Sequence, residues 1–225
     1  VLARMVTEGA KAAPDWLDAI TRVAVDESLD PAFRALALRL PGEDDMAQTL
    51  FAAGVTPDPQ AIHDARGRMA LAQAERLKAV LPGMLTALGA SGPFSPDARA
   101  AGRRALRLVA LGLQSRLDGG AAAAAAYRAA DNMTEQQGSL ACLLDIGAGQ
   151  GELASFAEQW QGDRHVMDKW FALQIAYAAP DRAAAVTEAL TGHPGFDMKN
   201  PNRFRAVLGA LSGNHAGFHH ASGAG

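Results

Sequence analysis

The sequence predicts an all-α fold, a curved α-solenoid or superhelical double layer of about ten to twelve antiparallel helices. The β-branched residues that a sheet core needs are scarce, with only ten Val and four Ile in 225 residues. Helix-forming Ala, Leu, Arg, Glu and Gln dominate instead. Pro, Gly and capping residues recur between apolar stripes of helical period. We therefore expect a single helical domain over residues 1–225.

Breakers and caps predict the helices of the first part of the chain. Pro14 opens one helix, and Asp30 followed by Pro31 gives a cap and a first helical residue for another. Asp58 starts a long segment that reaches residue 88, and Pro82 should kink it. The expected helices before this segment span residues 15–27, 33–40 and 43–53.

The clearest helix starts at residues 95–97 and runs to about residue 117. Its apolar stripe contains Leu106, Val109, Ala110, Leu113 and Leu117. An alanine run at 121–126 follows a Gly pair and predicts a thin, closely packed helix. The remaining predicted helices span residues 135–146, 152–160, 164–177, 181–190 and 203–211.

Charge and cysteine content narrow the function classes. The formal net charge is −3, which favours neither nucleic acid nor an anionic membrane as a partner. Arg103, Arg104 and Arg107 lack interleaved aromatic residues and indicate a solvated helix face. Cys142 is the single cysteine, which suits a reducing, cytoplasmic compartment, and no apolar run is long enough for a membrane span. No secretory signal is visible. Because the chain begins with Val1 and not with Met, we expect a piece of a longer protein.

The sequence offers no metal site and no catalytic residue. A zinc peptidase needs His-Glu-x-x-His on a helix, where two imidazoles hold the metal and the Glu acts on its water. None of the six His residues fits this pattern. His215 and His219 are four apart, but no Glu follows His215 and Gly residues surround the pair. Cys142 has no His nearby in the sequence, which indicates a structural thiol.

One string suggests a different enzyme class. Residues 143–152, Leu-Leu-Asp-Ile-Gly-Ala-Gly-Gln-Gly-Glu, resemble the first motif of S-adenosylmethionine-dependent methyltransferases, where a strand ends in a Gly-rich turn. The stretch that follows predicts helices, whereas that fold needs alternating strands and helices. We therefore favour a helix closed by Gly147 and a loop at 149–151, and keep a methyltransferase as a minor alternative.

Several strings resemble the bacterial aminopeptidase N family in order and spacing. They are Asp-Asn-Met-Thr-Glu at 131–135, Val-Met-Asp-Lys-Trp-Phe at 166–171, His-Pro-Gly-Phe at 193–196 and Asn-Pro-Asn-Arg-Phe-Arg at 200–205. The segment Asp-Pro-Ala-Phe-Arg-Ala-Leu at 30–36 is also similar to that family. Near the end, Ser222 and Ala224 depart from the family's pattern of Asp and Ser.

This resemblance implies a zinc metallopeptidase that removes N-terminal amino acids from peptides. Such enzymes have a β-rich domain, a thermolysin-like catalytic domain with the zinc, a β-sandwich and a helical C-terminal domain that caps the active-site chamber. The chain resembles the first two-thirds of that last domain. Its partners would be the missing domains of the same chain and peptide substrates, and it would hold no zinc and be inactive alone.

Four residues are candidates for the substrate channel. Asn200 or Asn202 can cap the helix that follows and thereby place Arg203 and Arg205 in its first turn. Because a helix N-terminus disfavours cations, the two arginines should face an anionic partner. The resemblance implies that these arginines lie near the substrate entrance. Arg205 is the first candidate and Arg203 the second. Pairing with carboxylates of the same domain is the alternative.

A binding function without catalysis is the second hypothesis for the whole chain. Stacked antiparallel helices form concave surfaces that bind peptides or proteins. A stand-alone helical-repeat module of this kind would need no zinc motif. The complete reading frame separates the two hypotheses, because a His-Glu-x-x-His motif upstream would indicate the peptidase.

Overall fold

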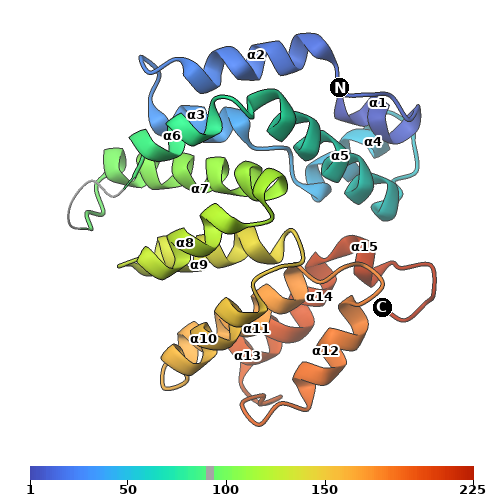
Figure 1. Ribbon diagram of the computed structural model, residues 1–225. Helices are drawn as coiled ribbons and strands as arrows, with labels where there is room; N and C mark the ends of the chain where they lie inside the picture. Colours follow the sequence, from blue (N-terminus) through green and yellow to red (C-terminus); the bar gives the residue numbers. More distant parts are fainter. Residues whose placement is uncertain (90–93) are drawn as a thin grey trace. The chain divides into compact units, whose positions relative to one another are not determined.

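A computed structural model describes residues 1–89 and 94–225 of the chain (Figure 1). No strand occurs in these two ranges, so the predicted all-α class is confirmed. The α-helices are α1 Leu2–Thr7, α2 Pro14–Val25, α3 Pro31–Leu38, α4 Glu43–Ala52, α5 Pro59–Leu77, α6 Leu81–Ala87, α7 Ala98–Asp118, α8 Ala121–Ala129, α9 Met133–Leu144, α10 Gln150–Trp160, α11 Arg164–Ala176, α12 Ala183–Thr191, α13 Pro201–Phe204, α14 Ala210–Gly213 and α15 His215–Phe218. A π-helical turn, η1, covers Arg205–Gly209.

The chain forms two compact units. The first unit is Val1–Ile146, which contains α1 to α9, and the second is Gly147–Gly225, which contains the remaining helices. Each unit has its own cluster of buried apolar side chains. The single domain over residues 1–225 stays a prediction.

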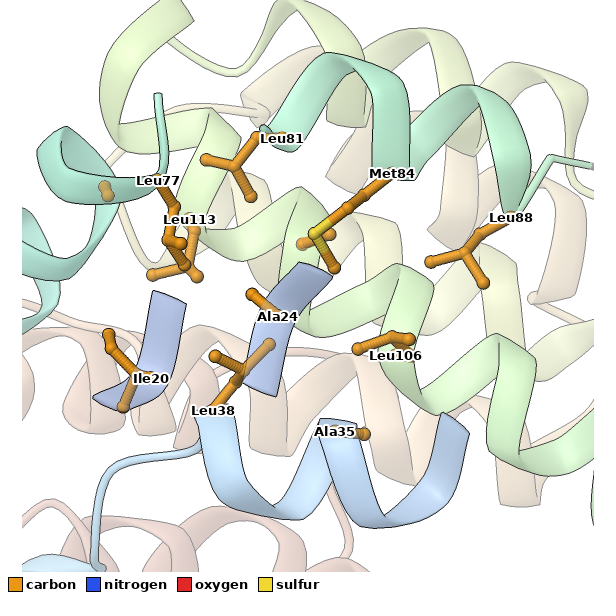
Figure 2. Packing of buried hydrophobic residues seen from close by; sticks show 12 residues of the cluster. Ile20, Ala24, Ala35, Leu38, Leu77, Leu81, Met84, Leu88, Leu106 and Leu113 are labelled. Atoms are coloured by element: carbon orange, nitrogen blue, oxygen red, sulfur yellow. The ribbon is translucent and has the colours of Figure 1, made fainter. Parts of the chain in front are cut away.

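In the first unit, α7 is the central helix. It contacts α3, α5, α6, α8 and α9. The side chains of Leu106 and Leu113 on α7 meet those of α2, α3, α5 and α6 in the main apolar cluster (Figure 2). Leu106, Leu77 and Leu81 have no exposed surface, and burial of each such side chain contributes about 2 kcal/mol. This cluster therefore holds the helices of the first unit together.

Side-chain caps start many of these helices, as the sequence predicts. The Asp30 carboxylate accepts hydrogen bonds from the amides of Ala32 and Phe33, and Pro31 fills the first helical position. Asp58 and Asp97 cap α5 and α7 in the same way. These bonds satisfy amides that have no partner within the helix, which fixes where each helix begins.

The long segment that starts at Asp58 differs from the prediction. It is not one kinked helix, because α5 ends at Leu77 and α6 starts at Leu81. The amide of Val80 bonds to the Leu77 carbonyl, a tight turn that ends the first helix. Pro82 then stands in the first turn of α6, where its missing N–H costs nothing.

The second unit is built around α11. Its residues Met167, Phe171 and Ile175 share the buried cluster with Leu190 of α12 and Val207 of η1. The helix predicted over 203–211 lies within a continuous helical segment at 201–213, in which η1 replaces the α-helical bonding pattern between α13 and α14. The π-helical turn inserts one extra residue in the helical bonding pattern, and such turns occur often at functional sites. This turn begins at Arg205, one of the candidate residues.

Candidate functional site

Asn200 fixes the start of α13. Its side-chain oxygen accepts hydrogen bonds from the backbone amides of Asn202 (3.0 Å) and Arg203 (3.3 Å). Pro201 occupies the first turn, where a missing N–H is tolerated. Asn200 therefore has the capping role that the sequence predicts. By fixing where the helix begins, it also fixes the positions of Arg203 and Arg205 along it.

Arg203 is buried, with 6% of its surface exposed. Its Nε donates to Asp168 Oδ1 at 2.6 Å, and its other nitrogens donate to the carbonyls of Gly195 and Arg164. A cation at a helix N-terminus needs an anionic partner, and for Arg203 this partner is the Asp168 carboxylate of the same unit. This geometry gives Arg203 a structural role, and Asp168 fixes α13 against α11.

Aromatic rings complete the surroundings of Arg203. Its guanidinium carbon lies 4.3 Å from the centre of the Phe171 ring, within the range of a cation–π contact. Phe171 also meets Trp170 and His193 edge to face, with ring centres 5.0 and 5.2 Å away. Trp170 donates its ring N–H to the Leu153 carbonyl at 3.1 Å, so this cluster joins three separate segments.

Arg205 has a different environment from Arg203. It is exposed at the start of η1, and its Nη1 donates to Asn202 Oδ1 at 3.1 Å. Asn202 is itself exposed. A guanidinium that faces solvent and is oriented by one neutral side chain keeps most of its donors available for an anion. Of the four candidate residues, Arg205 and Asn202 form the accessible pair, and Asn200 and Arg203 support them.

The described residues do not fit a catalytic zinc ion. No group of three or more His, Cys, Asp or Glu side chains in residues 1–89 and 94–225 is arranged to hold a metal. His215 and His219 lie at the two ends of the short helix α15, and His219 packs edge to face on Phe218 at 5.0 Å. Burial raises the pKa of the Cys142 thiol to about 12, and its Sγ donates to the Leu108 carbonyl at 3.6 Å, which favours a structural thiol.

The methyltransferase alternative is contradicted by the structure. Residues 143–152 contain the end of α9, a loop and the start of α10, and no strand precedes the glycines. Gly147 and Gly149 have φ angles of 73° and 82°, the left-handed conformation that ends one helix and precedes the next. The string therefore links two helices and does not open a nucleotide-binding fold.

The fold is that of a helical-repeat protein, and the exposed Arg205 and Asn202 form its candidate binding site. A family model described as "Domain of unknown function (DUF3458_C) ARM repeats" matches residues 1–225. The chain belongs to this family. Because ARM repeats are stacked helices that form solenoids, the match also supports the predicted solenoid class. Within the described residues, no helix is both long and apolar enough to cross a membrane.

Similar proteins include bacterial aminopeptidases. Aminopeptidase N of Caulobacter vibrioides is 39% identical over 98% of this chain and 26% of its own length. Aminopeptidase N of Escherichia coli K12 is 31% identical over 92% of this chain and 24% of its own length. The crystal structure of Legionella pneumophila aminopeptidase A in complex with aspartic acid has a TM-score of 0.85 at 23% identity, covering 98% and 28% of the two chains. This chain thus spans about a quarter of these relatives.

Proposed function

We propose that the chain is the C-terminal helical domain of a zinc-dependent aminopeptidase that removes N-terminal amino acids from peptides in the cytoplasm. The observation that carries this proposal is the similarity of nearly the whole chain to one quarter of bacterial aminopeptidases N. The role of the domain is to cap the active-site chamber, so that peptides enter and folded proteins do not.

The catalytic zinc and its ligands belong to another domain of the same protein in this proposal. Within the described residues, no group of three or more His, Cys, Asp or Glu side chains could hold a metal ion. Large apolar side chains lie on the surface, with Leu36 70% and Phe51 75% exposed. Such residues supply contact area for the remaining domains.

Arg205 is the residue that we place at the substrate channel. Its exposed guanidinium and the Asn202 amide can bind the carboxylate at the far end of a peptide. Asn200 and Arg203 act indirectly, because they hold the first turn of α13 in position. A substrate without a free carboxylate gains nothing from this arrangement.

Kinetics of the whole protein, expressed from its complete reading frame, test this role. We expect Arg205→Ala to raise the KM for trialanine about fivefold, the range for an exposed charged contact, and to leave alanyl p-nitroanilide unaffected. Arg182→Ala is the matched control, since it removes an exposed arginine from the same unit. Equal effects on both substrates, or equal effects of both variants, would contradict the channel role.

The second candidate is a stand-alone helical-repeat module that binds a peptide or protein. In this candidate, the exposed Phe33 and Leu36, 53% and 70% accessible on α3, would contact a separate partner in place of the remaining domains. The complete reading frame separates the candidates. A His-Glu-x-x-His motif upstream supports the peptidase, and an open reading frame limited to this helical region supports the module.

A further inference from the structure

A cavity in the first unit lies between the end of α2, the start of α3, α6 and α7. Its volume is about 580 Å³, within the usual range of about 300–1,000 Å³ for small-molecule sites. Apolar side chains, mostly of α2 and α6, line it together with charged side chains, mostly of α3 and α7; the apolar part is called the apolar wall. The cavity is lined by Ala24, Val25, Glu27, Pro31, Arg34, Val80, Gly83, Met84, Ala87, Leu88, Arg99 and Arg103.

The charged side chains of this cavity are mostly cationic. Three guanidinium groups, of Arg34, Arg99 and Arg103, face one carboxylate, that of Glu27, which leaves a net charge of +2. Asp26 lies close by, and its pKa is lowered by hydrogen bonds from Ser28 and, to a smaller extent, by Arg34. Asp26 is exposed and does not line the cavity, so it offsets only part of the positive charge, through Arg34.

Arg34 shows the clearest sign of a missing partner. It is 7% exposed, and its Nη2 donates to the Ala24 carbonyl, whereas its Nε is buried without any hydrogen-bond partner. A buried N–H of a charged group that makes no hydrogen bond costs free energy. No described carboxylate forms an ion pair with Arg34, so an anion in the cavity would balance its charge.

Arg99 and Arg103 approach the cavity from α7. They are four residues apart and therefore lie on one face of the helix, one turn from each other. Arg103 donates to the Ala87 carbonyl at 2.8 Å, which fixes its head at the end of α6. Arg99 makes no side-chain hydrogen bond or ion pair with another described residue. Like charges at this spacing repel, and a bound anion would relieve the repulsion.

The apolar wall restricts the type of anion. Met84 and Leu88 of α6 and Ala24 of α2 are buried members of the main cluster (Figure 2), and their outer atoms line the cavity. An inorganic anion would leave this wall in contact with water. A ligand that has an apolar group next to its anionic head would cover the wall and reach the arginines.

We propose that this cavity binds an organic carboxylate with an apolar side chain or tail. The carboxylate accepts hydrogen bonds from the heads of Arg99 and Arg103 beside the Arg34 guanidinium, and the apolar group lies on Met84 and Leu88. The shared chemistry fits both a peptide with an apolar C-terminal residue and a short fatty acid. Every residue of this site belongs to the first unit, and none of the observations that support it rests on the proposed peptidase function.

Nuclear magnetic resonance titration of the ¹⁵N-labelled 225-residue chain tests the site. The probes are N-acetyl-L-leucine, octanoate, N-acetyl-L-leucinamide and inorganic phosphate. We expect saturable shifts at the amide of Gly83 with the two carboxylates, with a Kd in the millimolar range. Tighter binding of N-acetyl-L-leucine identifies the peptide-like source, and tighter binding of octanoate identifies the fatty acid.

Variants decide whether the arginines are responsible. Arg99→Gln should weaken binding of the better carboxylate about tenfold, because a charged hydrogen bond is lost. Arg22→Gln removes an exposed arginine of α2 that does not line the cavity, and should leave the Kd unchanged. Circular dichroism of both variants checks that they fold. Equal binding of leucinamide, binding of phosphate alone, or no saturable shift with either carboxylate would overturn the proposal.

Discussion

Replacing Arg203 by Met tests whether one buried ion pair holds the second unit together. The side chains of Arg203 and Asp168 are 7% and 17% exposed, and their atoms meet at 2.6 Å. The substitution removes the guanidinium group and its hydrogen bonds. It keeps an apolar contact, because Met is unbranched and can still pack on Phe171. Asp168 would then keep its charge in a poorly hydrated position, and the carbonyls of Gly195 and Arg164 would lose a donor.

The expected cost is set mainly by the carboxylate that loses its partner. Removal of one member of a buried ion pair costs about 3–5 kcal/mol in the free energy of unfolding. Because Asp168 keeps some contact with water, we expect the lower end, about 3 kcal/mol. Converting Asp168 to Asn removes the unpaired charge, so Arg203→Met should cost about 1–2 kcal/mol less in that background.

Urea unfolding followed by circular dichroism measures these differences. Arg205→Met is the matched control, because Arg205 is exposed and bonds only to Asn202 among the described side chains. That control should change the free energy of unfolding by less than about 0.5 kcal/mol. If Arg203→Met lowered the free energy of unfolding by less than about 1 kcal/mol and by no more than the control does, the structural role of Arg203 would be refuted.

Four other predictions concern packing and ionisation. Gly217→Ala should destabilise the chain by about 1–3 kcal/mol in urea unfolding, because a Cβ there would lie 2.5 Å from a Cβ of α12. Gly67→Ala, where nothing lies within 4 Å of the new atom, should stabilise α5 by about 0.5–1 kcal/mol, and the opposite order would contradict the packing. Burial raises the pKa of Cys142 from 9.0 to about 12, so its thiol should resist Ellman's reagent in the folded chain near pH 8 and react in urea. The free energy that the neutral thiol contributes to folding is complete below pH 9 and is lost as the pH rises toward 12. The pKa of His63 is raised by its hydrogen bond to Glu43, so His63→Gln should destabilise the chain below about pH 6.5 and have no effect at high pH, which thermal unfolding at two pH values measures.

The helices could be predicted because their signals are local. Asp30 and Asp58 stand directly before a Pro, and a cap needs only the residues that follow it. The break after Leu77 was not predicted, since Pro82 is the visible breaker and the tight turn precedes it. The short α1 and the π-helical turn at Arg205 also carry no signal in composition or spacing.

The candidate site was predicted only in part. Asn200 is a capping residue by its sequence alone, and the structure has this cap. The pairing of Arg203 with Asp168 joins residues that are 35 positions apart, and nothing in the local pattern identifies which carboxylate is used. The arginine-lined cavity could not be predicted for the same reason, because its residues are distant in the sequence. Arg99 and Arg103 share a helix face by their spacing, but only the fold brings Arg34 beside them.

The central claim is that this helical domain shapes the chamber of a zinc aminopeptidase whose catalytic groups lie elsewhere in the same protein. Zinc analysis and hydrolysis of alanyl p-nitroanilide test it most directly, with the 225-residue chain and the protein from the complete reading frame measured side by side. We expect zinc and hydrolysis in the longer protein and neither in the chain alone. Stoichiometric zinc together with hydrolysis in the isolated chain would contradict the account.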